Sequence, residues 1–177
     1  LGGGGDDILI GGGQYPWETL LDGNDSIVGG GGNDYINGDV GNDTLKGGSG
    51  NDTIFDNEGN DILYGNKGDD ILAGGNGTDR MKGGVGNDTL YGESGADRVW
   101  GNGGNDLFAY KGAFHSNVVD GTDTIMDFNL AEDTLYIDYL LPGNDLVVSY
   151  AVEGGREYTY VTVSYTHLRA HETNVDL

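Results

Sequence analysis

The sequence predicts an all-β fold, a parallel β-solenoid of about six 18-residue coils followed by a short antiparallel β cap. Three observations support this expectation. A nine-residue phrase recurs in phase from residue 2 to residue 109. Glycine supplies 36 of the 177 residues and proline only 2, which suits closely spaced turns and excludes collagen. Acidic residues outnumber basic residues 30 to 8, which gives a formal charge of −22.

The repeat consists of twelve consecutive nonads without a gap, starting at Gly2. In eleven of the twelve, position four is glycine, position six is aspartate, and position eight is aliphatic, methionine or phenylalanine. All the exceptions fall in one degenerate nonad, residues 11–19, where Gln14, Pro16 and Glu18 stand at these positions. A fixed period of this length predicts a stacked architecture in which each repeat contacts its neighbours.

Each position of the nonad has an expected physical role. Glycine at position four fits a turn with positive φ, and glycine at positions one and two lets backbone carbonyls approach a ligand. Asparagine or aspartate at position five tolerates the turn. Positions seven to nine form a short strand whose eighth residue, from Leu9 to Phe108, points into a thin core. Two nonads make one coil, and six coils spaced at about 4.8 Å give a roll roughly 29 Å long.

Composition also limits the classes of function. The strong negative charge argues against nucleic acid and anionic membranes as partners, and it favours cations. The chain has no cysteine, which excludes disulfides and thiol chemistry. No apolar run reaches the roughly 18 residues of a membrane span. Neither H-E-x-x-H nor G-x-S-x-G occurs, so we expect this fragment to be non-enzymatic.

Nonads such as "GGSGNDTIF" (47–55) and "GGVGNDTLY" (83–91) resemble the RTX nonapeptide repeat G-G-x-G-x-D-x-U-x. The resemblance implies a β-roll in which Ca²⁺ lies between neighbouring turns on one side, held by aspartate carboxylates and glycine carbonyls. About nine ions are implied, with no site at the Pro16 turn. One side is expected to stack Asp7, Asp25, Asp43, Asp61, Asp79 and Asp97, and the other Asp34, Asp52, Asp70, Asp88 and Asp106. The glycines expected at the metal sites are Gly29, Gly47, Gly65, Gly74, Gly83, Gly92 and Gly101.

The same resemblance implies a secreted bacterial module that folds on binding extracellular Ca²⁺. Such a module supports the folding and one-step (type I) export of a covalently linked domain. Alternatives remain open. One is a solenoid that binds no metal, and another is a structural repeat of a surface adhesin. A third is a polysaccharide-binding module similar to the R-modules of alginate epimerases, with Lys46, Arg80, Lys82 and Arg98 as its basic groups.

The outer face of the even-numbered nonads carries an apolar stripe, which we expect the C-terminal segment of the same chain to cover. A neighbouring domain or a partner is the alternative. The stripe consists of Tyr35, Phe55, Ile71, Ala73, Tyr91, Leu107 and Ala109.

After residue 109 the period stops, and residues 110–162 are expected to form a truncated capping β segment. "DGTDTIMDF" (120–128) and "EDTLYIDYL" (132–140) resemble the aspartate-rich strand pair that follows the repeats of serralysin-type proteases and of epimerase R-modules. Asp127, Asp133 and Asp138 are candidates for one more calcium site there. "GGR" (154–156) indicates a hairpin.

The last residues need separate treatment. "VSYTHLRAHET" (163–173) resembles a translated sequencing adapter, as in assembled metagenomic reads. We therefore expect residues 163–177 to be non-native, with the true C-terminus and its export signal missing.

Overall fold

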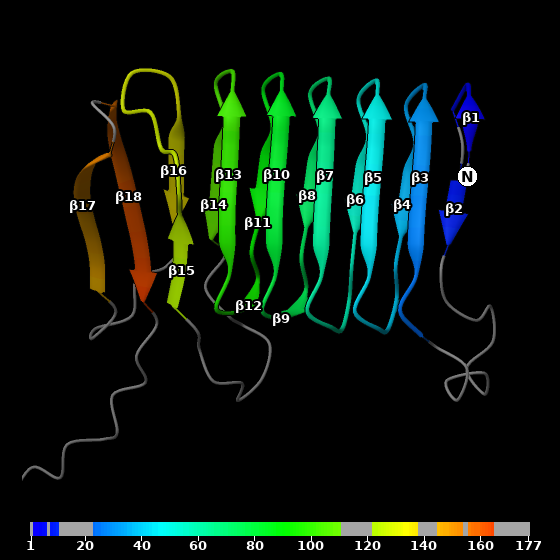
Figure 1. Ribbon diagram of the computed structural model, residues 1–177, viewed down its shortest axis with the longest axis horizontal. Helices are drawn as coiled ribbons and strands as arrows, with labels where there is room; N and C mark the ends of the chain where they lie inside the picture. The colour runs from blue at the N-terminus through cyan, green and yellow to red at the C-terminus, as the bar shows by residue number, and fades with distance from the viewer. Residues whose placement is uncertain are drawn as a thin grey trace, which may run out of the picture.

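The computed structural model describes residues 2–6, 8–10, 23–110, 122–137, 145–153 and 156–164. Every regular element among these residues is a β-strand, and none of them lies in a helix. Figure 1 shows the strands standing side by side along one long axis. The strands are β1 (Gly3–Gly4), β2 (Ile8–Ile10), β3 (Ser26–Gly31), β4 (Tyr35–Asn37), β5 (Thr44–Ser49), β6 (Thr53–Phe55), β7 (Ile62–Lys67), β8 (Ile71–Ala73), β9 (Asn76–Gly77), β10 (Arg80–Val85), β11 (Thr89–Tyr91), β12 (Ser94–Gly95), β13 (Arg98–Gly103), β14 (Leu107–Tyr110), β15 (Thr122–Ile125), β16 (Thr134–Ile137), β17 (Asp145–Glu153) and β18 (Arg156–Ser164).

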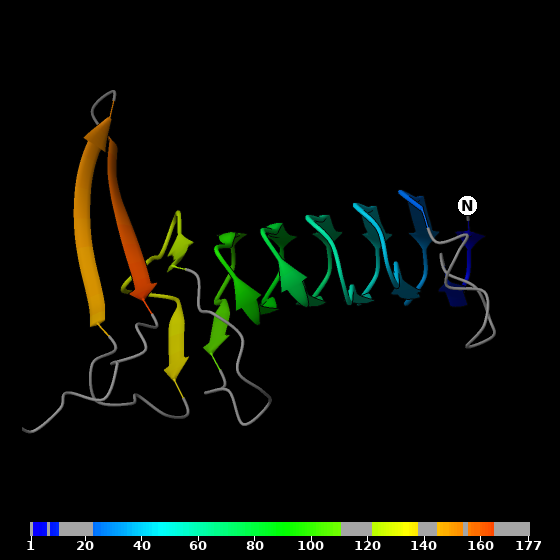
Figure 2. The same cartoon turned by 90° about the horizontal axis from the view of Figure 1, so that it is seen from below.

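The strands form two facing sheets, seen edge-on in Figure 2. One has nine strands in the order β1-β3-β5-β7-β10-β13-β15-β18-β17, and the other has seven in the order β16-β14-β11-β8-β6-β4-β2. Pairing inside the roll is parallel and shifts by 18 residues per coil, as for Ile27 opposite Leu45. The predicted fold class, an all-β parallel solenoid, is confirmed. Strands β3 to β14 make five complete coils.

The core is one residue wide from each sheet, as position eight predicts. Leu45, Leu63 and Met81 of the nine-stranded sheet face Ile54 and Leu72 of the other, and all five side chains are fully buried. The neighbouring positions seven and nine lie on the outer faces, where Tyr35 keeps 43% of its surface exposed. The core therefore supplies little apolar burial per coil, and the turns must contribute much of what holds the coils together.

The N-terminal nonad does not stack where the unbroken phase predicts. The sequence places it one full coil before Ile27, but β2 pairs with β4 and sets Leu9 opposite Ile36, 27 residues away. The first nonad therefore joins the seven-stranded sheet, and its expected place in the other sheet is wrong. The degenerate nonad explains the skip, because Pro16 lacks an N–H for the sheet and Glu18 cannot fill the core.

The parallel stacking continues past the last nonad. β15 pairs with β13 and β16 with β14, both in parallel, so these strands add another coil to the roll. The hairpin formed by β17 and β18 is antiparallel and pairs through β18 with β15, which confirms the antiparallel cap at this end. Backbone pairing of β18 runs to Ser164, two residues into the tail expected to be non-native.

The apolar stripe is not covered by the described part of the C-terminal segment. β17 and β18 extend the nine-stranded sheet at its end (Figure 2) and do not lie over β4 to β11. Ile71 remains 40% exposed, and the ring of Tyr35 packs against that of Phe55 at 5.9 Å between centroids. Ala73 and Ala109, by contrast, are buried.

Candidate metal centre

Two rows of aspartates run along the two sets of turns, and each row is a hydrogen-bonded ladder. The Oδ1 atom of one aspartate accepts a hydrogen bond from the backbone N–H of the aspartate one coil earlier, at 2.7–3.0 Å. The Asp61 row contains Asp25, Asp43, Asp61, Asp79, Asp97 and Asp123. The Asp52 row contains Asp34, Asp52, Asp70, Asp88, Asp106 and Asp133. The repeat aspartates within residues 23–110 thus lie on the two sides that the sequence predicts.

In seven of these aspartates, and in the neighbouring Asp56, the second carboxylate oxygen is buried and has no hydrogen-bond partner. This holds for the Oδ2 atoms of Asp52, Asp56, Asp61, Asp70, Asp79, Asp88, Asp97 and Asp123. The side chains themselves are at most 4% exposed. Buried polar atoms are normally hydrogen-bonded, and burying a charged oxygen without a partner costs free energy. The pattern therefore indicates that these oxygens bind a ligand.

The electrostatic field around the two rows has one sign. Burial, the largest cause, and neighbouring acidic groups together raise the pKa of Asp79 to about 8 and that of Asp88 to about 7. Burial also raises the pKa of Asp70 and of Asp106 to about 6. Every charged neighbour that contributes to these shifts is acidic. A divalent cation would supply the missing positive charge and hold the carboxylates ionised.

In eight of the nine nonads between residues 29 and 109, glycine at position one keeps a space open beside the second carboxylate oxygen of the aspartate. A Cβ added there would lie no more than 2.8 Å from Oδ2 of the aspartate in the same nonad. At Gly29 it would also lie 2.8 Å from the carbonyl oxygen of Gly47, in the next coil. Carboxylate and carbonyl oxygens therefore border the same space, and hard oxygen donors are the ligands that Ca²⁺ takes. The glycines with this relation are Gly29, Gly38, Gly47, Gly65, Gly74, Gly83, Gly92 and Gly101.

Position two has a different role from the one expected. Eight of the nine described residues at this position between 30 and 102 have positive φ, including Asn66 at 81° and Glu93 at 68°. Position two is thus a left-handed turn position, filled by glycine, asparagine, aspartate or, at residue 93, glutamate, and close approach to a ligand does not explain it. Position four fits the expected turn, since Gly68 has φ 120°.

Position five forms a ladder that the sequence analysis missed. The Oδ1 atom of Asn33 accepts a hydrogen bond from the backbone N–H of Asn51 at 2.7 Å, and Oδ1 of Asn51 accepts one from Asp69 at 3.0 Å. In this ladder the side-chain oxygen accepts from the N–H of the following coil. In the aspartate rows it accepts from the N–H of the preceding coil. Asparagine at this position therefore links coils as well as tolerating the turn, and its recurrence every 18 residues is the signal that could have revealed this.

Beyond the nonads, Asp123 is the residue that the sequence analysis overlooked. It is fully buried and takes the next place in the Asp61 row, where "GTDTI" (121–125) repeats the glycine, aspartate and aliphatic spacing of a nonad. The structure places the expected candidate Asp133 at the end of the Asp52 row. Asp127 instead accepts hydrogen bonds from the backbone of Gly101 and Asn102, and Asp138 lies outside the described residues.

The predicted pairing of Asp7 with Asp25 is not supported. Asp7 lies outside the described residues, but its neighbour Asp6 accepts a hydrogen bond from the backbone N–H of Asn33 at 2.7 Å. Together with the pairing of β2 on β4, this puts the first nonad against the turns of the Asp52 row. The Pro16 turn, where no site is expected, also lies outside the described residues.

Comparison with family models identifies the repeat. The model for the RTX calcium-binding nonapeptide repeat, which holds four copies, matches residues 1–15, 21–45, 38–72, 46–81 and 73–108. The chain belongs to the RTX calcium-binding repeat family. It is therefore a calcium-binding repeat module, and the buried, unpaired oxygens of its two rows fit Ca²⁺ as the bound ion. Searches of curated proteins and of solved structures found no match.

Proposed function

We propose that this RTX module folds as it binds Ca²⁺ between neighbouring turns of both rows, and that it thereby supports the folding and export of a larger secreted protein. The observation that carries the proposal is the series of buried Oδ2 atoms without hydrogen-bond partners, which runs along the two rows from Asp52 to Asp123. Without a cation, each row stacks like charges. Two carboxylates about 5 Å apart repel by roughly 3 kcal/mol at an effective dielectric of 20.

Calcium reverses this balance, so its binding energy becomes folding energy. Through most of the roll the core contributes one large buried side chain per strand, such as Leu63 or Ile54, which is little to set against the repulsion along both rows. Extracellular calcium is millimolar, which suffices for sites in the 10⁻⁴–10⁻³ M range known for extracellular modules. A secreted location agrees with this requirement. Nowhere in the described chain does a helix have the length and hydrophobicity needed to cross a membrane.

The ladders revise the number of sites that we propose. Within the described residues each row holds six consecutive aspartates, which makes five neighbouring pairs per row and about ten sites in place of nine. Asp123 and Asp133 each add a pair, while the pair of Asp7 with Asp25 is removed. Carbonyls of the position-one glycines complete the shell in this proposal.

Circular dichroism at pH 8, where the buried carboxyls are ionised, with calcium, with magnesium and with excess chelator tests the proposal. We expect a β spectrum in calcium, a largely unfolded spectrum in chelator, and little recovery in magnesium, whose strict octahedral geometry suits the site poorly. Calorimetry then counts the ions. A full β spectrum in chelator would refute calcium-coupled folding. Export is tested separately, by comparing secretion of a fused passenger with and without the roll.

A second candidate function has one specific observation in its favour. On the outer face of the nine-stranded sheet, Lys46 lies over the ring of Tyr64 at 5.6 Å, and Lys82 lies over the ring of Trp100 at 5.2 Å. These side chains alternate in one line across β5, β7, β10 and β13. Arg80 lies beside the same Trp100 ring at 5.8 Å. Cations interleaved with aromatic rings suit a linear acidic polysaccharide, since they offer ion pairs and stacking together.

Retention on immobilised polyuronate in calcium tests this candidate. Replacing Lys46 and Lys82 with glutamine should abolish retention if the line binds the polymer, and Lys67→Gln, an exposed lysine outside the line, is the matched control. Equal retention of all three proteins, or none, would contradict it. The flanking gene sequence separates an exported enzyme from an adhesin, in which the roll is a structural repeat.

A further inference from the structure

One nonad carries an acid where the others between residues 29 and 109 carry glycine. Position one is glycine in eight of these nine nonads, and in the ninth it is Asp56. The Asp56 side chain is 4% exposed, so it lies inside the turn rather than on the surface. Its Oδ1 atom accepts a hydrogen bond from the backbone N–H of Asn57 at 2.9 Å. Its Oδ2 atom is buried and has no hydrogen-bond partner.

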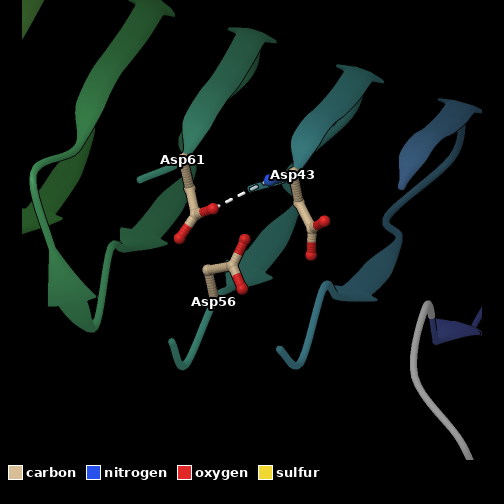
Figure 3. Close-up of side chains that lie close together, drawn as sticks. All are labelled: Asp43, Asp56 and Asp61. Atoms are coloured by element: carbon tan, nitrogen blue, oxygen red, sulfur yellow. Dashed lines mark hydrogen bonds between the residues drawn. The ribbon is translucent and has the colours of Figure 1, made fainter. Parts of the chain in front are cut away.

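Asp56 points at two members of the Asp61 row. Figure 3 shows the carboxylates of Asp43, Asp56 and Asp61 turned toward one another from two adjacent coils. One oxygen from each lies within 4.8 Å of the others. The Oδ2 atom of Asp61 is also buried without a partner, whereas its Oδ1 atom accepts from the backbone N–H of Asp43 at 2.8 Å. The unpaired Oδ2 of Asp56 therefore belongs to a buried carboxylate that shares one small space with the carboxylates of Asp43 and Asp61.

The coil below leaves room for this third carboxylate. Asp56 reaches over Gly38, the position-one residue of the preceding odd nonad. A Cβ on Gly38 would lie 2.6 Å from Oδ2 of Asp56 and 2.5 Å from Oδ2 of Asp43. Glycine at residue 38 and aspartate at residue 56 are thus complementary, and no other neighbouring pair of position-one residues between 29 and 101 places an acid above a glycine.

We propose that Asp43, Asp56 and Asp61 form a three-carboxylate cation site that is the tightest calcium site of the roll. The inference rests on the proposed function, and it assigns to one site a ligand that the repeat pattern does not supply. Calcium affinity in oxygen sites rises with the number of charged ligands. One extra carboxylate is expected to tighten this site about ten-fold relative to neighbours that hold two.

The proposal is tested by whether replacing Asp56 stabilises or destabilises the fold. Without a cation, Asp56 is a buried acid among like charges, and Asp56→Asn would stabilise the fold by removing repulsion. With a cation held by the cluster, the same change weakens binding and destabilises the fold. Urea unfolding at a fixed millimolar calcium concentration should show Asp56→Asn and Asp56→Gly destabilised by about 1.4 kcal/mol, which corresponds to the ten-fold loss. Stability unchanged or increased in either variant would overturn the site.

A matched control removes a charge outside the cluster. Asp69→Asn keeps the oxygen that accepts from the backbone N–H of Asn87, and this exposed side chain lies on the other set of turns. The free energy of unfolding of Asp69→Asn in calcium should equal that of the wild type. If wild-type protein unfolds identically with calcium and with chelator, the proposed function itself is refuted. If calcium stabilises the wild type but Asp56→Asn is equally stable in calcium, only the three-carboxylate site is refuted.

A direct measurement uses a trivalent ion. Crystals grown in calcium and soaked in substoichiometric Tb³⁺ should give their strongest anomalous peak within coordination distance of Asp43, Asp56 and Asp61. The higher charge of Tb³⁺ favours the site with most carboxylates. A strongest peak between two aspartates of the Asp52 row would overturn the ranking.

Discussion

The backbone N–H of Asp97 donates a hydrogen bond to Oδ1 of Asp123 at 2.9 Å, across 26 residues of chain. Between coils of the repeat the same bond spans 18 residues, as between Asp79 and Asp97. The Asp61 row therefore extends beyond the last nonad, and its final member, Asp123, belongs to the segment that follows the repeats. Since β15 also pairs with β18, Asp123 lies where the roll meets its antiparallel hairpin.

Replacing Asp123 with alanine should weaken the last coils. The change leaves the buried N–H of Asp97 without its acceptor and removes a proposed calcium ligand. A loss of about 1–3 kcal/mol is expected from the unpaired donor alone. Urea unfolding in saturating calcium measures it. Glu58→Ala, an exposed residue that pairs only through its backbone, should change stability by less than about 0.5 kcal/mol. Equal effects of the two changes would contradict this role.

Glycine at position four should tolerate no side chain. Gly68 has φ 120°, and a Cβ there would overlap the carbonyl of Gly50. Gly68→Ala is expected to destabilise the roll by more than about 2 kcal/mol, because strain and overlap add. Gly103→Ala is the control, since a Cβ there would meet its nearest atom at 3.8 Å. Thermal melts in calcium compare the two, and similar melting temperatures would argue against the steric role.

The repeat pattern predicted the parts of the structure that depend on local periodicity. Position eight, as in Leu63, is the core, and position six, as in Asp52, forms the rows. Both follow from an 18-residue coil in which strand alternation fixes the facing of every side chain. The ladder at position five was missed because asparagine has a sufficient local explanation in turns, and only stacked coils reveal its second partner.

The nine-residue period alone could not predict which coil a segment stacks on. The sequence counted the degenerate nonad as a half coil, yet β2 stacks on β4 as though that half coil were absent. Pairing between coils is a long-range choice, and a nonad without its glycine and its core residue has little to hold it in register. Asp123 was missed for a related reason, because the change of spacing from 18 to 26 residues hid a turn of ordinary composition.

Asparagine at position five should be replaceable by aspartate but not by alanine. Asn51 links its coil to both neighbouring coils, since its backbone N–H donates to Oδ1 of Asn33 and its Oδ1 accepts from the backbone N–H of Asp69 at 3.0 Å. Asn51→Asp retains the acceptor, as Asp69 itself does one coil later at 2.7 Å. Asn51→Ala should cost about 1 kcal/mol. Urea unfolding in calcium distinguishes them, and equal losses would show that the side-chain acceptor is unimportant.

Acid should partly replace calcium. Burial, the largest cause, raises the pKa of Asp56 and of Asp79 to about 8, and that of Asp70 to about 6, from the ordinary aspartate value of 3.8. A carboxyl whose pKa is higher in the folded state stabilises the fold below its unfolded pKa, and this contribution is lost as pH rises through the folded value. The calcium-free protein should therefore keep β structure near pH 5 and lose it between about pH 6 and pH 8.

Calcium should reverse this dependence, because it binds the ionised carboxylates and must displace their protons. More calcium is then needed for folding at pH 5.5 than at pH 7.5. Circular dichroism across pH, in chelator and in calcium, measures both trends in one experiment. The apo trend should weaken in Asp79→Asn, whose amide does not titrate, and persist in Asp69→Asn. Unfolding of the calcium-free protein on acidification would contradict the sign derived from these pKa shifts.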